Sequence, residues 1–221
     1  MIYLVSGNQQ LFEATLCKQI SIEASIEMMD AWNKVQYDSE TDGRDAHVNH
    51  LLCTQFGNKE ANAQIVVDCS TIDIKKYKDI LETKLVIGHN LKFDLQFLYN
   101  YGIIPLKVYD TMIVEQMLYM GYPSGQVSFS LKETAWRRLN INIDKTVRGE
   151  IIWRGLDEKV IEYAALTYWG RIISNYYLEK WMNCWKAKGA ILGQSAAKHR
   201  VHSMKVHRLP EQFSLLNNRS V

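Results

Sequence analysis

The sequence lacks the features that mark secreted, disulfide-bonded and membrane proteins. Its four cysteines, Cys17, Cys53, Cys69 and Cys184, are scattered and form no C-x-x-C pair, so we expect neither a disulfide framework nor a structural zinc site. No apolar run approaches the roughly 18 residues needed to span a bilayer. The N-terminus has no basic lead and no small-residue cleavage site, so we predict no signal peptide. We therefore expect a protein of the reducing cytoplasm with no membrane partner.

Acidic residues are missing from one long segment near the C-terminus, between Glu179 and Glu211. The basic residues and histidines in this gap include Lys186, Lys188, Lys198, His199, Arg200, His202, Lys205, His207 and Arg208. The net charge of the whole chain is only +2, which does not by itself indicate a nucleic-acid binder. The segment is either a solvated basic tail or an arm that binds phosphates without sequence preference.

The length and composition fit one globular domain. A chain of 221 residues with 47% hydrophobic and 23% charged residues is long enough for one substantial core and too short for two. The hydrophobic pattern dissolves beyond Gly189. We expect a single domain over residues 1–188 and a basic C-terminal tail without regular structure over residues 189–221.

The apolar pattern predicts an α/β sheet with helices packed on it. Three strand candidates follow one another closely, which favours an antiparallel meander, and Ser21 is placed to cap a helix. Strands are expected over 2–5, 35–40, 50–56, 64–68 and 84–88, helices over 21–32, 74–82, 90–101, 112–120, 131–139 and 156–186, and irregular structure over 140–155.

The segment Tyr37–Gly43 carries the strongest chemical signal. Its residues alternate with the period of a strand, which places Asp38 and Glu40 on one face, two residues apart. Thr41 and Asp42 then begin a turn, so the two acids should lie at the exposed end of the strand. Adjacent carboxylates repel each other unless a cation lies between them. The pair indicates either a divalent-metal site or two solvated acids.

Two later segments contain candidate partners for this pair. Asn90 and Asp94 are four residues apart at the start of a helical pattern, so both should lie on one helix face at the mouth of the preceding strand. Phe93, between them, has the pattern of a core residue. Tyr163 lies on the long helix near the C-terminus, where packing is the alternative to a chemical role.

Taken in order, the segments DSETDG (38–43), GHNLKFD (88–94) and YAAL (163–166) resemble the proofreading 3′–5′ exonuclease domain of family A DNA polymerases. The resemblance covers roughly residues 34–175 and places the chain in the tyrosine branch of the DEDD exonucleases. It implies a ribonuclease H-like fold, with a mixed sheet flanked by helices. In that family the polymerase follows as a separate domain, so a DNA polymerase acting in trans is an implied partner.

The resemblance also implies hydrolysis of phosphodiester bonds with two Mg²⁺ or Mn²⁺ ions. Asp38 would bridge both ions, Glu40 would help to hold the first, and Asp94 would act on the second. Tyr163 would orient the attacking water. The residues implied to contact the terminal nucleotide are Thr41, His89, Asn90 and Phe93, and Arg44 either grips a phosphate or is solvated.

The match fails at one position of the third motif. That motif is tyrosine, three residues, then aspartate, but Thr167 stands where the aspartate is expected. A threonine hydroxyl offers a lone pair without the negative charge through which hard dications mainly bind. Glu162 cannot readily replace it, because it points about 140° away around a helix of 3.6 residues per turn. We expect the loss to weaken the first ion and to reduce the rate by orders of magnitude.

Three functions remain open on the sequence. The leading hypothesis is a metal-dependent 3′–5′ exonuclease of the proofreading type that acts on single-stranded DNA 3′ ends and is impaired by Thr167. The second is a catalytically degenerate exonuclease fold that serves as a nucleic-acid-binding module. The third is the trimming of RNA 3′ ends in the manner of RNase D.

Overall fold

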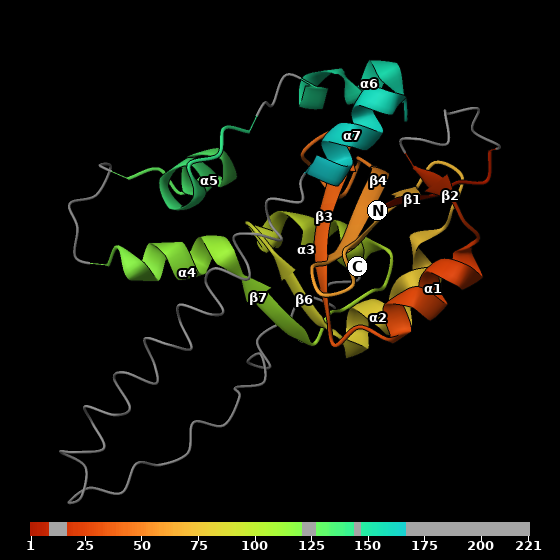
Figure 1. Ribbon diagram of the computed structural model, residues 1–221, viewed down its shortest axis with the longest axis horizontal. Helices are drawn as coiled ribbons and strands as arrows, with labels where there is room; N and C mark the ends of the chain where they lie inside the picture. Colours follow the sequence, from red (N-terminus) through yellow and green to blue (C-terminus); the bar gives the residue numbers. More distant parts are fainter. Residues whose placement is uncertain (9–16, 121–126, 144–146, 167–221) are drawn as a thin grey trace, which may run out of the picture. The chain divides into compact units, whose positions relative to one another are not determined.

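A seven-stranded mixed sheet forms the centre of the molecule (Figure 1). The computed structural model describes residues 1–8, 17–120, 127–143 and 147–166, all within one compact unit. Thr167 and the tail over 189–221 lie outside the described residues. The strand order is β2-β1-β5-β4-β3-β6-β7. The strands are β1 (Ile2–Val5), β2 (Lys18–Gln19), β3 (Lys34–Thr41), β4 (Leu51–Asn58), β5 (Ala63–Asp68), β6 (Leu85–Gly88) and β7 (Lys107–Asp110).

The antiparallel meander expected from the sequence is confirmed. β3 pairs antiparallel with β4, and β4 pairs antiparallel with β5. Parallel strands extend the sheet on both sides, with β1 beside β5 and β6 beside β3. The two outer strands, β2 and β7, were not among the strands expected from the sequence; β2 has only two residues, too few to show a period.

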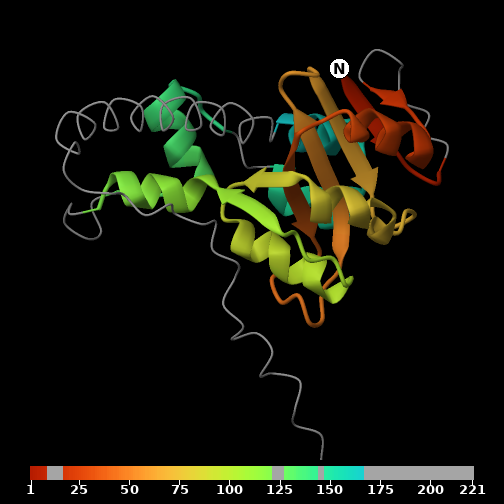
Figure 2. The same cartoon turned by 90° about the horizontal axis from the view of Figure 1, so that it is seen from below.

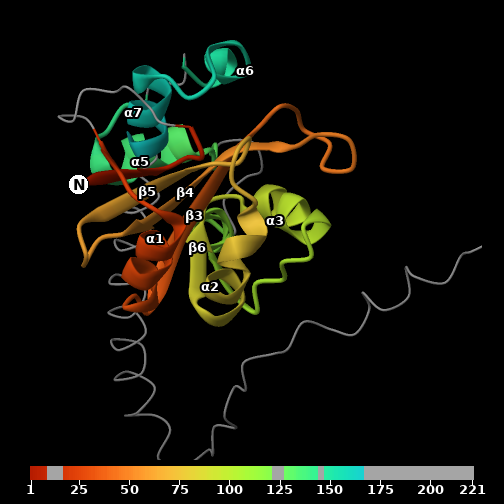
Figure 3. The ribbon, with the colours of Figure 1, turned by 90° about the vertical axis from the view of Figure 1, so that its right-hand side faces the viewer.

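Helices cover both faces of the sheet (Figure 3). One face packs against α1 (Ile22–Asp30), α2 (Lys78–Thr83) and α3 (Leu91–Asn100), and the other against α7 (Glu158–Leu166). The remaining helical elements are α4 (Thr111–Leu118), α5 (Leu131–Leu139), α6 (Ile151–Arg154) and the 3₁₀ turns η1 (Ile74–Tyr77) and η2 (Val147–Glu150). In the described part of the chain, no helix has both the length and the apolar character needed to cross a membrane.

Local sequence signals account for most helix boundaries. The Ser21 side chain accepts a hydrogen bond from the Ala24 amide at 3.1 Å and begins α1 as expected. The helix expected over 74–82 instead starts as a 3₁₀ turn, because the Asp73 carboxylate accepts a hydrogen bond from the Lys75 amide and closes a tight turn. The stretch expected to be irregular contains η2 and α6, whose four residues each are too short for a helical period to be recognised.

An aromatic stack anchors β3 on the face covered by α1, α2 and α3. The Phe56 ring lies 5.6 Å from the Tyr37 ring and 5.0 Å from the Tyr77 ring, measured between centroids. All three side chains are buried, and the Tyr77 hydroxyl lies 2.8 Å from the Ser25 hydroxyl of α1. Such tilted aromatic pairs stabilise a core beyond the area that they bury. The stack therefore fixes the strand that carries Asp38 and Glu40.

A buried ionic cluster joins α4 to α5, the two helices beside the β7 edge of the sheet (Figure 2). The Glu115 carboxylate is fully buried and accepts hydrogen bonds from two arginines of α5. Arg137 donates to Glu115 Oε1 from Nη2 at 2.8 Å, and Arg138 donates to Oε2 from Nη2 at 3.1 Å. Both guanidinium groups also lie over the Tyr119 ring, at 5.1 and 5.5 Å from its centroid.

Candidate active site

Strand β3 places Asp38 and Glu40 on the sheet face covered by α7. Asp38 lies opposite Gln55 of β4, and Glu40 lies opposite Cys53. Glu40 is only 5% exposed and Asp38 is half-buried, so the expectation that both acids lie at an exposed strand end was wrong. The reason is that α7 packs Ile161 onto this face beside Cys53. An irregularity in the pairing with β4 follows directly after Glu40 and ends the regular ladder.

Asp94 reaches the end of β3 from α3. Its Oδ1 accepts a hydrogen bond from the Ser39 hydroxyl at 2.5 Å, and the side chain is 3% exposed. Burial raises the pKa of Asp94 well above its usual range, and the negative charges of Asp38 and then of Glu40 raise it further. The hydrogen bond from Ser39 opposes this shift. The structure therefore brings together the three carboxylates that the sequence singled out, closely enough for their charges to interact.

The turn between β6 and α3 sets the position of Asp94. Gly88 lies against β3: a Cβ atom there would be 2.8 Å from the Tyr37 carbonyl oxygen and 2.4 Å from Leu91 Cδ2. Only glycine fits so close an approach. Asn90 follows in the left-handed region, with φ 64° and ψ 42°. This tight turn lets α3 start beside β3 and point Asp94 at Ser39.

Asp110 is a site-building residue whose role sequence reasoning missed. Its carboxylate accepts hydrogen bonds from the amides of Asn90 at 3.0 Å and Leu91 at 2.9 Å. It also accepts one from the Met112 amide at 2.9 Å and so caps α4. An aspartate directly before a helical pattern is a recognisable N-cap. Its second contact, to the first turn of a helix 20 residues earlier, leaves no sequence signal.

Tyr163 is buried on α7 and packs against Ile151 and Val160. Leu52 of β4, which lies beside the pairing irregularity after Glu40, borders the same cluster. A packing role is thus present, as the sequence allowed. The position of the missing fourth carboxylate, Thr167, lies outside the described residues.

The residues expected to contact the terminal nucleotide lie at the end of β3, on the loop that follows it, and around the start of α3. The Thr41 hydroxyl donates to the Gly43 carbonyl at 2.5 Å, and Arg44 is exposed on the following loop. Asn90 is exposed, whereas Phe93 is half-buried, with its ring 5.2 Å from that of Phe97. The Phe93 side chain therefore packs against Phe97 as a core residue does and is also partly exposed to solvent.

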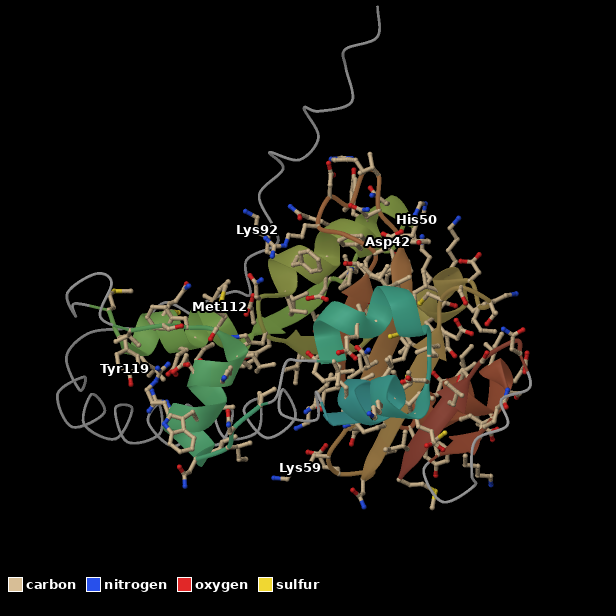
Figure 4. The ribbon with its side chains drawn as sticks, turned by 90° about the horizontal axis from the view of Figure 1, so that it is seen from above. Asp42, His50, Lys59, Lys92, Met112 and Tyr119 are labelled. Atoms are coloured by element: carbon tan, nitrogen blue, oxygen red, sulfur yellow. The ribbon has the colours of Figure 1, made fainter. Side chains whose placement is uncertain are left out.

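The loop that carries Arg44 is closed by Asp42 and His50, which lie side by side in Figure 4. The His50 amide donates to Asp42 Oδ1 at 2.6 Å, and the His50 ring nitrogen lies 3.4 Å from Oδ2. Desolvation raises the pKa of Asp42, but these hydrogen bonds outweigh it, and the net shift is downward. The closed base of the loop holds the Arg44 backbone beside the end of β3.

His89 joins three parts of the fold and does not simply face solvent. Its Nδ1 lies 2.9 Å from the Thr111 hydroxyl, and its Nε2 lies 2.9 Å from the Phe129 carbonyl oxygen. The Thr111 hydroxyl in turn donates to the Gly88 carbonyl at 2.9 Å. The side chain therefore ties the end of β6 to the start of α4 and to the segment before α5.

The carboxylates offer the oxygen donors that Mg²⁺ and Mn²⁺ prefer. Burial and then the negative charges of Asp38 and Glu40 raise the pKa of Asp94, and a bound cation would relieve the repulsion between these charges. As the side chains stand, no three His, Cys, Asp or Glu residues of the described ranges are gathered tightly enough to hold an ion as a group. The donor chemistry of these carboxylates fits a hard dication.

Comparison with known sequences identifies relatives of the chain. A family model described as a 3′–5′ exonuclease matches residues 15–167. DNA polymerase I of Aquifex aeolicus (strain VF5) is 32% identical over 109 residues. That match covers 49% of this chain but only 17% of the polymerase, so the chain corresponds to a small part of its curated relative.

Similar solved structures are nucleases with the same fold. Escherichia coli RNase D, an exoribonuclease involved in structured RNA processing, has a TM-score of 0.59 at 21% identity, covering 81% of this chain and 49% of that one. Brucella melitensis NrnC with bound Mg²⁺ has a TM-score of 0.55 at 18% identity, covering 92% and 99%. Because the family model matches well over half of the sequence, the chain belongs to the 3′–5′ exonuclease domain family of family A DNA polymerases, with its ribonuclease H-like fold.

Proposed function

We propose that the chain is a two-metal-dependent 3′–5′ exonuclease that removes nucleotides from single-stranded DNA 3′ ends, at a rate reduced by Thr167. The observation that supports this most is the meeting of Asp38 and Glu40 from β3 with Asp94 from α3 in a largely buried place. Carboxylates are rarely collected in this way unless they serve chemistry. We also propose that the domain extends over residues 1–188 and works in the cytoplasm.

Each residue has a defined task in this proposal. Asp38, Glu40 and Asp94 provide oxygen ligands, and Tyr163 orients the attacking water. The bound Mg²⁺ or Mn²⁺ pair supplies activation of that water and stabilisation of the leaving 3′ oxygen. The residues that hold the terminal nucleotide are Thr41, Arg44, His89, Asn90 and Phe93. The His89 ring nitrogens face Thr111 and Phe129, so in this proposal His89 contributes to nucleotide binding by fixing the backbone beside Asn90.

The test is degradation of a 5′-labelled single strand in magnesium and in manganese. The unaltered chain is compared with Thr167→Asp and with the double variant Thr167→Asp/Asp38→Ala. Thr167→Asp should restore the fourth carboxylate and raise the rate by orders of magnitude. The double variant should not cut, which also excludes a contaminating nuclease. If Thr167→Asp folds and binds the strand but does not cut, the exonuclease proposal fails.

A nucleic-acid-binding module without catalysis is the second candidate, favoured by Thr167 and the basic segment over 189–221. It predicts binding to single strands that weakens steeply with salt and no cleavage even after Thr167→Asp. RNA is the alternative substrate, because RNase D shares the fold. Matched DNA and RNA oligonucleotides in the same assay distinguish the two. A DNA polymerase acting in trans remains the proposed protein partner, tested by co-purification with the full chain.

A further inference from the structure

A row of polar residues crosses the sheet directly behind Asp38. Gln36 of β3, Gly57 of β4 and Gln64 of β5 are paired side by side in the strand register. Gln55 of β4 lies opposite Asp38 in the next row. Because side chains alternate along a strand, all of these positions belong to the same sheet face as Asp38. Such a face, packed between a sheet and helices, is usually apolar.

Two polar atoms of this row are buried without a partner. Gln55 is 3% exposed and Gln64 is 6% exposed, and within the described part of the chain neither Gln55 Oε1 nor Gln64 Nε2 has a hydrogen-bond partner. The Gln55 amide is oriented by its Nε2 group, which donates to Cys53 Sγ at 3.3 Å. An amide oxygen and an amide N–H group left unpaired in the interior are costly, and in folded proteins they usually bind ordered water.

The room for a ligand comes from Gly57. A Cβ atom at this position would lie 2.7 Å from Gln64 Oε1 and 3.0 Å from Gln36 Oε1, so the two glutamine side chains lean over the glycine. Both glutamines, together with Gln55 and Asp38, line a pocket of about 30 Å³. One water requires roughly 10–15 Å³ by the same measure. The pocket is therefore large enough for about two waters.

We propose that this pocket holds two ordered water molecules that connect Gln55 and Gln64 to the carboxylate of Asp38. One water donates to Gln55 Oε1 and accepts from Gln64 Nε2, which satisfies both unpaired atoms. The second water donates to Asp38, which lines the same pocket. Gln55 and Gln64 are thereby positioning residues that fix the Asp38 side chain from behind. This last role rests on the proposed function, whereas the water site does not.

A high-resolution crystal structure of the full chain tests the water site. Two waters should be seen within hydrogen-bond distance of Gln55 Oε1 and Gln64 Nε2, and Gly57→Ala should displace at least one of them. A dry pocket, or glutamines turned to bond each other, overturns the proposal whatever the chain does to DNA.

The positioning role is tested by calorimetric titration of Mn²⁺ into Thr167→Asp protein, which needs no turnover. Gln55→Leu should weaken Mn²⁺ binding by about tenfold, the lower end of the effect of removing a group that orients a metal ligand. Gln116→Leu, at an exposed glutamine of α4, is the matched control and should leave the affinity unchanged. Equal affinity in Gln55→Leu and the control, with both proteins folded by their melting curves, refutes the positioning role. If no variant binds Mn²⁺, the positioning role and the proposed function both fail. The water site is then tested by the crystal structure alone.

Discussion

Replacing Glu115 with glutamine should destabilise the protein through the two arginines that it leaves behind. The carboxylate is fully buried, whereas the Arg137 and Arg138 side chains are 24% and 23% exposed. Glutamine keeps the shape and one acceptor oxygen but removes the negative charge. The two guanidinium groups would then lose the negative charge that they share, whereas Arg137 would keep its bonds to the Ser128 carbonyl.

The expected loss in the free energy of unfolding is about 3 kcal/mol. Breaking a buried ion pair by removing one partner costs roughly 3–5 kcal/mol. Partial exposure of both arginines lets water screen their charges, which places the value at the lower end. For a chain of this size, each kcal/mol shifts Tm by about 2–4 °C, so Tm should fall by roughly 6–12 °C.

Urea unfolding and thermal melting of the full chain measure this loss. Glu133→Gln is the matched control, because Glu133 is an exposed residue of α5 whose replacement should change stability by less than about 0.5 kcal/mol. Equal stability of Glu115→Gln and the control would show that the side chains of Arg137 and Arg138 move into solvent in the variant. The reasoning on buried charge would then be refuted.

Three further predictions follow from single contacts. In EDTA, stability should fall as pH rises above the normal carboxyl pKa of about 4, because burial and nearby negative charge raise the pKa of Asp94 in the folded state. Asp94→Asn should reduce this fall in melting curves between pH 4 and 8, and an unchanged slope would contradict a raised pKa of Asp94. His89→Ala should speed hydrogen exchange of amides in Ser130–Leu139, because the link to Phe129 is lost; protection equal to the wild type argues against it. Tyr77→Phe should cost about 1 kcal/mol in urea unfolding through the lost contact with Ser25, and a neutral result would mean that the hydroxyls do not bond.

Much of the fold was predictable because the central strands carry strong periodic signals. Three strand candidates in close succession predicted the antiparallel meander, whereas its register is known from the structure. Ser21 marked the start of α1 because its side chain suits the N-cap position. The two-residue strand β2 and the four-residue helix α6 were missed because each is too short for its own period to be detected.

The candidate site was predictable as a set of residue types but not as an arrangement. The pattern around Asp38 and Glu40 shows that they share a face, yet nothing local shows that Glu40 is buried under α7. Contacts between distant segments, such as Asp110 with the start of α3, depend on how the elements pack. The unpaired atoms of Gln55 and Gln64 likewise become visible only when three strands are in register.

Strand β3 builds the site from both of its faces, and this explains why its register matters so much. Asp38 and Glu40 project to the side covered by α7, while Ser39 projects to the other side and holds Asp94 of α3. Val35 and Tyr37, which share the face of Ser39, lock the strand into the core. A slip of one residue would exchange the two faces, bury Asp38 among apolar side chains and turn Ser39 away from Asp94. The aromatic packing of Tyr37 with Phe56 therefore supports the chemistry directly, because the same register that buries these rings brings the three carboxylates together.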